Sequence, residues 1–169
     1  RNSLKCIIVS SQLSKGAMQM ITKYVDSYVT VEEANAFFDA TLNSDAWDEA
    51  DDIKKEKALK MATRQIDRLP FQGRKLGYNQ NLEFPRNITA KAFTDGVPQQ
   101  VKYATCEQAL FLLQGGNKRQ ELQAQGVKSY SLGDLSETFS ENLTDAQKTI
   151  CPEALSYLRK YMLGSVAIC

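Results

Sequence analysis

Histidine does not occur in the 169-residue sequence, and cysteine is scarce and widely spaced. Without histidine, the usual general base of Ser-His and Cys-His catalysis is missing. The four cysteines form no CxxC pair and have no histidine to complete a zinc site, which argues against a structural metal and a disulfide framework. Reduced thiols in a cytoplasmic setting are expected. The sequence thus predicts a protein that is not an enzyme and has no catalytic, metal-binding or cofactor-binding residues.

Long apolar runs and a strong net charge are missing as well. No segment approaches the roughly 18 apolar residues that a membrane helix needs, so no membrane partner is expected. The 21 lysines and arginines are nearly balanced by 20 acidic residues, which gives a formal net charge of +1. No global field therefore draws the protein onto nucleic acid, and any contact with a polyanion has to come from a local patch.

What the chain does contain predicts a mainly α fold, a small helical bundle with an extended β-hairpin arm and a C-terminal helix. Residues 1–23 lack helical periodicity and are expected to form a flexible or non-native N-terminal arm. A helical core is expected over residues 24–116 and an extended hairpin or arm over residues 117–150. Residues 151–169 are expected to form a C-terminal helix and tail.

The core is expected to begin with a capped helix from about Val31 to Leu42. Thr30 and Glu33 have the spacing of a capping box, in which the hydroxyl accepts a backbone N–H and the glutamate bonds back to the cap. Ala34, Phe38 and Leu42 follow at helical spacing and predict an apolar inner face. Ser44 is expected to cap a short turn that carries Trp47.

Two longer helices complete the predicted core. The first begins at the acidic pair Asp51 and Asp52, which suits the positive end of the helix dipole, and ends before Pro70. The second begins at Pro98 and ends near Gly115. Their inner faces are expected to form one buried cluster, with Leu59, Ile66, Leu110 and Leu113 as its members.

The loop "FQGRKLGYNQNLEFPR" between these helices mixes basic and aromatic residues. Arg74, Lys75 and Arg86 are candidate DNA-facing residues, because a single-strand binder combines phosphate contacts with base stacking. The alternative is an ordered loop with buried aromatic residues and solvated basic residues. The alternation of Leu82 and Phe84, typical of core anchors, favours that alternative.

The segment after residue 116 predicts a β-hairpin around Gly133 and Asp134, followed by a short helix that begins at Pro152. A hairpin alone is marginal in water, and a short isolated helix is marginal too, so both are expected to need a surface outside their own subunit. Deleting residues 152–169 is therefore expected to leave the core folded. The candidate interface residues are Val127, Tyr130, Leu132, Leu135, Phe139, Leu155, Leu158, Tyr161 and Met162.

Five stretches carry a resemblance to a known family: "YVTVEEANAFF", "SDAWDEADDIKKEKALKMATRQIDRLPFQGRK", "LEFPR", "VPQQVKYATCEQALFLL" and "GVKSYSLGDLSETF". Together they resemble small tailed-phage proteins that are encoded among the head and head-tail joining genes. The resemblance runs from about Tyr24 to Leu163, and the first 20 residues lie outside it.

Two functions are implied by this resemblance. One is a head-tail adaptor, a homo-oligomeric ring, commonly of twelve subunits, that lies in the virion neck after assembly in the host cytoplasm. Such a ring would bind the portal protein and a downstream tail or stopper protein, and double-stranded DNA would pass through its channel. The other is a DnaT-like single-stranded-DNA-binding accessory protein. The near-neutral charge favours the adaptor, since DNA affinity depends mainly on phosphate neutralisation.

Overall fold

The computed structural model describes residues 21–88, 96–116, 118, 122, 125–126, 129–132, 135–138 and 149–163. The helices are α1 (Val31–Phe38), α2 (Asp45–Asp48), α3 (Asp52–Ile66), α4 (Gln99–Leu113) and α7 (Pro152–Leu158), which continues into the 3-10 helix η1 (Arg159–Tyr161). The strands are β1 (Arg74–Lys75), β2 (Arg86–Asn87), β3 (Ser129–Leu132) and β4 (Leu135–Thr138). The predicted mainly α class is confirmed.

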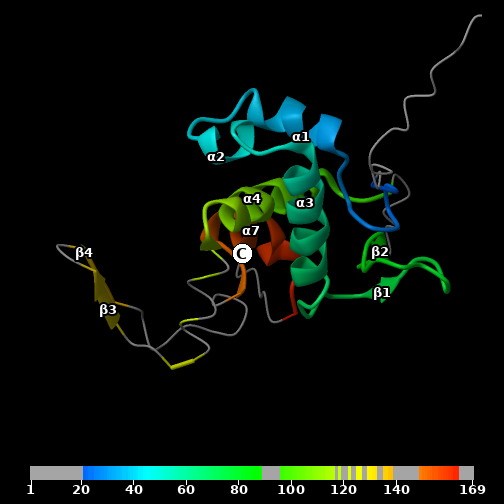
Figure 1. Cartoon of the computed structure of the whole chain (residues 1–169). Coiled ribbons are helices and arrows are strands. Elements are labelled where there is room, and N and C mark those ends of the chain that lie inside the picture. The colour runs from blue at the N-terminus through cyan, green and yellow to red at the C-terminus, as the bar shows by residue number, and fades with distance from the viewer. Residues whose placement is uncertain are drawn as a thin grey trace, which may run out of the picture.

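Helix α4 lies at the centre of the helical core (Figure 1). It packs against α3 and α7, and it also contacts α1 and α2. Fully buried alanines occur on all three of the tightly packed helices: Ala62 on α3, Ala104 and Ala109 on α4, and Ala154 on α7. Such small side chains let helix axes approach closely, because the interaxial distance is set by the side chains at the contact.

The first helix begins as predicted but ends one turn early. Both hydrogen bonds of the capping box between Thr30 and Glu33 are present. The helix ends at Phe38 and the chain then turns, reaching a positive φ of 61° at Asn43. Leu42 therefore lies outside the helix and is 88% exposed, so its predicted place on the inner face is wrong.

The long helices agree with the sequence in their starts and inner faces. The side chain of Asp51 caps α3 by accepting a hydrogen bond from the amide of Lys54 at 2.7 Å. In the predicted core cluster, Leu59, Ile66 and Leu110 are buried and Leu113 is partly buried.

The predicted cap of the short helix α2 is wrong. Ser44 does precede α2, but its hydroxyl donates to the carboxylate of Asp48 and makes no side-chain hydrogen bond to the backbone of the helix.

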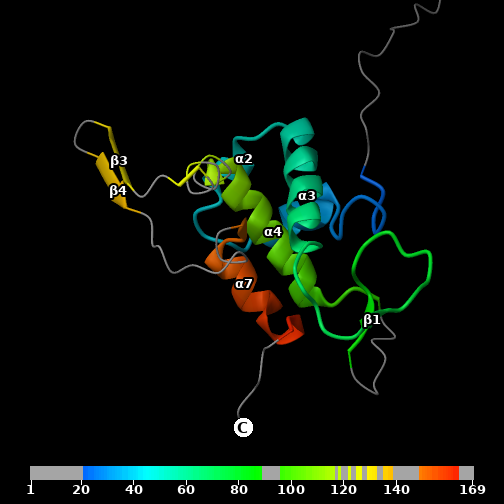
Figure 2. The same ribbon diagram turned by 90° about the horizontal axis from the view of Figure 1, so that it is seen from below.

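The C-terminal helix belongs to the helical core. Ile150, Ala154, Leu158 and Tyr161 are all buried in the same cluster as the residues of α3 and α4. Figure 2 shows α7 running beside α4. The predicted division between a core that ends at residue 116 and a separate terminal helix is therefore corrected: the helix packs on its own subunit.

A buried glutamine joins three parts of this core. The side-chain nitrogen of Gln108 on α4 donates to the side-chain oxygen of Gln65 on α3 at 2.7 Å and to the carbonyl of Thr149 at 3.2 Å. Its side-chain oxygen accepts from the amide of Cys151, just before α7, at 2.8 Å. Gln108 is completely buried, so these bonds replace the water that its amide group loses.

The segment before α1 is also part of the core. Tyr28 and Val29 are fully buried, and Ile21 packs against the cluster. The ammonium of Lys23 lies 2.5 Å from a carboxylate oxygen of Glu33. Residues 21–23, which the predicted arm 1–23 had contained, therefore belong to the packed core region, and residues 1–20 lie outside the described residues.

Candidate functional site

The loop from Phe71 to Ile88 folds back on itself through a two-residue pair of strands. β1 and β2 are antiparallel, with Arg74 opposite Asn87 and Lys75 opposite Arg86. Phe71, Leu82 and Phe84 are buried, and the rings of Phe71 and Phe84 meet edge to face with centroids 4.7 Å apart. Most of the loop's aromatic surface is therefore part of the core, as the alternative to DNA binding predicts.

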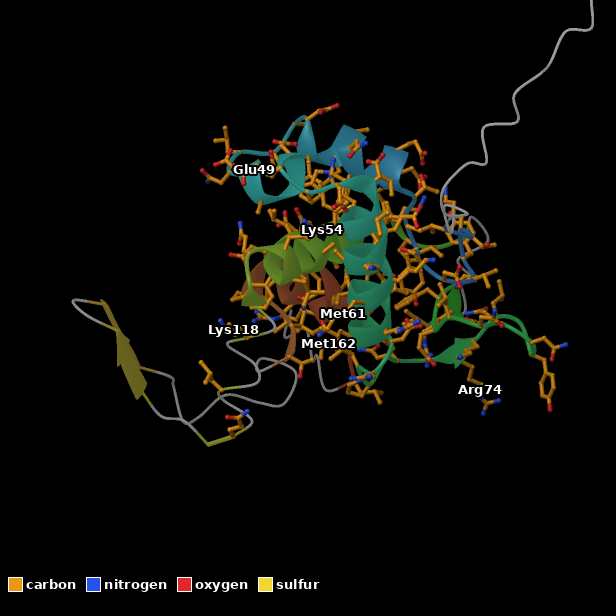
Figure 3. The ribbon with its side chains drawn as sticks, viewed as in Figure 1. Glu49, Lys54, Met61, Arg74, Lys118 and Met162 are labelled. Atoms are coloured by element: carbon orange, nitrogen blue, oxygen red, sulfur yellow. The ribbon has the colours of Figure 1, made fainter. Side chains whose placement is uncertain are left out.

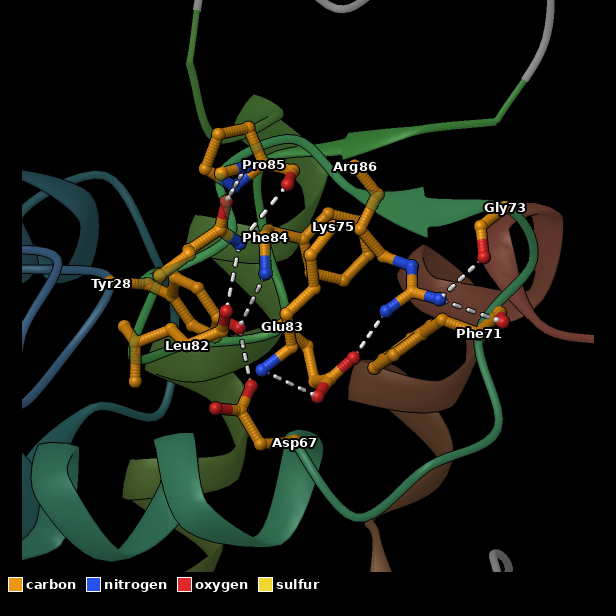
Figure 4. Close-up of polar contacts among 12 residues, drawn as sticks. Tyr28, Asp67, Phe71, Gly73, Lys75, Leu82, Glu83, Phe84, Pro85 and Arg86 are labelled. Carbon is orange, nitrogen blue, oxygen red and sulfur yellow. Dashed lines mark hydrogen bonds and ion pairs between the residues drawn. The ribbon is translucent and has the colours of Figure 1, made fainter.

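Arg86 is a structural residue of this loop, and its prediction as DNA-facing is corrected. Its guanidinium is buried and donates to the backbone carbonyls of Gln72 at 2.9 Å, Phe71 at 3.2 Å and Gly73 at 2.8 Å. It also forms an ion pair with Glu83 (Figure 4). These contacts use four of the five N–H donors of the guanidinium inside the subunit, because the loop wraps around it, so the buried side chain is poorly placed to bind a phosphate.

The other two predicted DNA-facing residues lie at the surface. The ammonium of Lys75 forms an ion pair with Glu83 at 3.0 Å, so one carboxylate serves both Lys75 and Arg86. Arg74 is exposed, and Figure 3 shows it pointing away from the helical core. Arg74 and Lys75 therefore lie on one exposed strand, whereas Arg86, opposite Lys75 on the paired strand, is buried.

Tyr78 is the exposed aromatic residue at the tip of this loop. Its ring is fully exposed, and Leu76 beside it is half exposed. Gln80 fixes the loop behind them: its side-chain nitrogen donates to the carbonyls of Leu82 at 2.8 Å and Pro85 at 3.0 Å, and its oxygen accepts from the amide of Gly77 at 3.2 Å. Tyr78 is thus an exposed aromatic ring on the same loop as the exposed Arg74, four positions along the chain, and the two are a candidate contact site.

The hairpin predicted after α4 is present. β3 and β4 are antiparallel, with Leu132 opposite Leu135, and they pair with each other to form a two-stranded sheet. Figures 1 and 2 both show this sheet standing away from the helical core, beyond the C-terminal end of α4. Two of the predicted interface residues, Val127 and Phe139, lie outside the described residues.

The predicted interface residues of the C-terminal helix pack in or against the core of their own subunit. Leu158 and Tyr161 are buried in the core of their own subunit, with 0% and 3% exposure, so their prediction as interface residues is corrected. Leu155 and Met162 are partly buried against the same core. The prediction treated the terminal helix as isolated, whereas α4 supplies the apolar surface that it needs.

A groove that sequence reasoning did not identify lies between α1 and the first half of α4. It encloses about 540 Å³ and is lined by Val29, Glu33, Ala36, Phe37, Ala40, Thr41, Gln99, Lys102, Tyr103 and Cys106. The rings of Phe37 and Tyr103 lie 5.0 Å apart at its wall. The doubled phenylalanine in "NAFF" was the available signal, since one helix face can bury only one of two consecutive residues.

The described residues contain no reactive thiol centre and no group of side chains that could hold a metal ion. Cys106 and Cys151 are free and buried. Burial raises the pKa of the Cys106 thiol to about 12 and that of Cys151 to about 11. Both thiols therefore stay protonated and unreactive near neutral pH. Among the described helices none is long and apolar enough to cross a membrane.

In a comparison with known families, residues 20–168 match a family described as "Putative DnaT-like ssDNA binding protein". The chain belongs to this DnaT-like family. No curated protein and no solved structure matches it significantly. The family match begins just before Ile21, the first described residue, and includes α7. The DnaT-like unit therefore comprises the helical core, the loop from Phe71 to Ile88 that Gln80 braces (the braced loop), and the hairpin β3–β4.

Proposed function

We propose that the chain is a structural head-tail adaptor of a tailed phage, which forms a homo-oligomeric ring beneath the portal and provides the docking surface for a tail or stopper protein. The ring would commonly have twelve subunits, would lie in the virion neck after assembly in the host cytoplasm, and would surround the double-stranded DNA. The observation that carries the proposal is the hairpin β3–β4, which stands apart from a compact helical core.

A two-stranded hairpin of four residues per strand is marginal in water by itself. Its open strand edges and apolar residues gain stability when another surface covers them. In a closed ring, each subunit offers that surface to its neighbour. When the head-to-tail contacts close into a ring, the hairpin of every subunit is covered by another subunit. The near-neutral charge of the chain also suits a channel through which duplex DNA slides, because strong phosphate contacts would hold it back.

The size of the purified protein in solution tests this proposal. We expect light scattering and negative-stain electron microscopy to show rings, either of the protein alone or together with the portal protein. Replacing residues 127–139 by a flexible Gly-Ser linker should abolish the rings and leave the thermal unfolding of the helical core unchanged. A wild-type protein that stays monomeric with and without the portal would contradict the adaptor function.

Single-stranded-DNA binding is the second candidate, favoured by the family description and by the exposed Tyr78 and Arg74 on one loop. An aromatic ring that stacks on a base contributes about 1–3 kcal/mol, and a neighbouring cation adds a phosphate contact. Within the predicted DNA-facing set, however, Arg86 is enclosed by its own loop and Lys75 is paired with Glu83. Arg74 and Tyr78 therefore remain as the contacts that this loop offers to a polyanion, which is a small site.

Fluorescence anisotropy with a labelled oligothymidine separates the two functions. The adaptor function predicts weak binding at physiological salt that changes little in the double variant Arg74→Ala, Tyr78→Ala. Submicromolar binding that this variant loses, and that the matched control Arg64→Ala on the exposed face of α3 retains, would establish the DnaT-like function instead. The salt dependence of binding then counts the phosphates that are contacted.

A further inference from the structure

The hairpin has one apolar face and one hydroxyl face. Its register sets Tyr130 opposite Glu137, and Leu132 opposite Leu135. Successive residues of a strand alternate between the two faces of a sheet, and residues opposite one another share a face. The register therefore assigns Tyr130, Leu132, Leu135 and Glu137 to one face. The other face receives Ser129, Ser131, Ser136 and Thr138.

The α1/α4 groove has an apolar lining, which suits it to bind the apolar face of the hairpin. Ala36, Ala40, Phe37 and Tyr103 give it an apolar floor and wall. At its rim, one carboxylate oxygen of Glu33 is shared by two ammonium groups, Lys23 at 2.5 Å and Lys102 at 3.9 Å. The lining itself carries one negative and one positive group, Glu33 and Lys102, and Lys23 adds a second cation to the same carboxylate from outside the lining. The apolar face of the hairpin, in turn, includes a single acidic residue.

The two surfaces lie toward opposite ends of α4. The α4 residues of the groove run from Gln99 to Cys106, in the first half of the helix. The hairpin follows the other end of α4, and both views in Figures 1 and 2 place it beyond that end, on the side away from α1. A helix of 15 residues is about 22 Å long, so the hairpin of a subunit stands well away from the groove of the same subunit.

We infer that the apolar face of hairpin β3–β4 docks in the α1/α4 groove of a second copy of the same chain. This inference rests on the proposed ring. The hairpin and the groove lie toward opposite ends of one molecule, so the contact between two copies joins different surfaces and is heterologous. Repeating such a contact generates a closed ring when the rotation from one subunit to the next returns to the first subunit. The face that carries Tyr130, Leu132 and Leu135 covers the apolar part of the groove, with Glu137 on the side of Lys102.

Two variants, each blocked on one side of this contact, test the inference. Ala36→Arg fills the groove from an exposed position on α1 and leaves the buried core untouched. Its matched control is Asp39→Arg, which adds the same side chain to the exposed end of that helix outside the groove. The double variant Leu132→Gln, Leu135→Gln removes the apolar face, and Ser131→Gln, Ser136→Gln is its control on the hydroxyl face.

Each blocked variant alone should be monomeric by mass photometry at a concentration where the wild type and both controls form rings. Mixed in equal amounts, the two blocked variants should form a heterodimer, because the intact hairpin of Ala36→Arg still fits the intact groove of the double glutamine variant. A third variant, Glu137→Lys, should weaken assembly at least tenfold at low salt and less at high salt. Circular dichroism melts establish that all variants remain folded.

The outcomes separate this inference from the proposed function. If the wild type forms rings and Ala36→Arg forms them equally well, the ring stands and the groove is not its receptor. If both blocked variants are monomeric and their mixture stays monomeric, the contact is not hairpin to groove between copies, and docking of the hairpin on its own subunit or on the portal replaces it. If the wild type forms no ring, the proposed function fails together with the inference.

Discussion

The phenol hydroxyl of Tyr28 donates a hydrogen bond to the carboxylate of Asp67 and accepts one from the backbone amide of Phe84 at 3.2 Å (Figure 4). Tyr28 precedes α1, Asp67 ends α3, and Phe84 belongs to the braced loop. One buried hydroxyl thus joins three segments that are far apart in sequence. The braced loop, with Arg74 and Tyr78 at its exposed side, owes its position to this junction and to Arg86.

Removing the hydroxyl in Tyr28→Phe should lower the free energy of unfolding by about 1–3 kcal/mol, because it leaves the buried amide of Phe84 without a partner and takes one hydrogen bond from the partly buried carboxylate of Asp67. Urea denaturation followed by circular dichroism measures this. Tyr24→Phe, at an exposed tyrosine four residues earlier, is the control and should unfold like the wild type. Equal stability of Tyr28→Phe and Tyr24→Phe would show that the junction contributes nothing.

The same junction predicts a dependence of stability on pH. Burial raises the pKa of Asp67 from 3.8 to about 6, since the charged carboxylate loses solvation in the folded state. The folded state therefore holds this proton more tightly, and the contribution of Asp67 to stability falls as the pH rises from about 4 to about 6. Above pH 6 the contribution is constant.

Asp67→Asn removes this titrating group. The difference in unfolding free energy between the variant and the wild type should shift in favour of the variant as the pH rises from 4 to 6, and should then stay level. Urea titrations at half-unit pH steps measure the difference. Asp39→Asn removes a carboxylate from the exposed end of α1 and controls for the change in net charge. A constant difference across this range would refute the assignment.

Arg86→Lys should destabilise the protein although it keeps the charge. A lysine can retain the ion pair with Glu83, but it lacks the planar fork that reaches the carbonyls of Phe71, Gln72 and Gly73. We expect a loss of about 1–3 kcal/mol in urea unfolding. Arg74→Lys, on the paired strand but exposed, should lose almost nothing. If the two variants were equally stable, Arg86 would not be the structural residue described above.

The C-terminal helix should be required for folding, contrary to the expectation from sequence that the core survives without it. Deletion of residues 152–169 removes Ala154, Leu158 and Tyr161 from the core, and we expect the remaining chain to lose its cooperative thermal transition. The single change Leu158→Ala should cost about 2–5 kcal/mol. Leu163→Ala, at an exposed leucine, is its control. A cooperative melt of the deletion variant would contradict the packing of α7.

Much of the fold and little of the candidate site was predictable from sequence. The two long helices and the hairpin each depend on residues close together along the chain, such as the cap at Asp51 and the pairing of Leu132 with Leu135. The site depends on contacts across the chain. The groove requires α1 and α4 to lie side by side, and the exposure of Tyr78 follows from how Gln80 braces the loop.

The sequence by itself determined where helices and the hairpin begin, because a cap or a turn residue acts within three or four positions of itself. It did not determine which polar and apolar groups meet. Arg86 was predicted at the surface by its charge, and its enclosure depends on carbonyls 13 to 15 positions away. Leu158 was predicted at an interface because its helix is short. Only the tertiary structure placed α4 against that helix, and the burial of Leu158 follows from this packing.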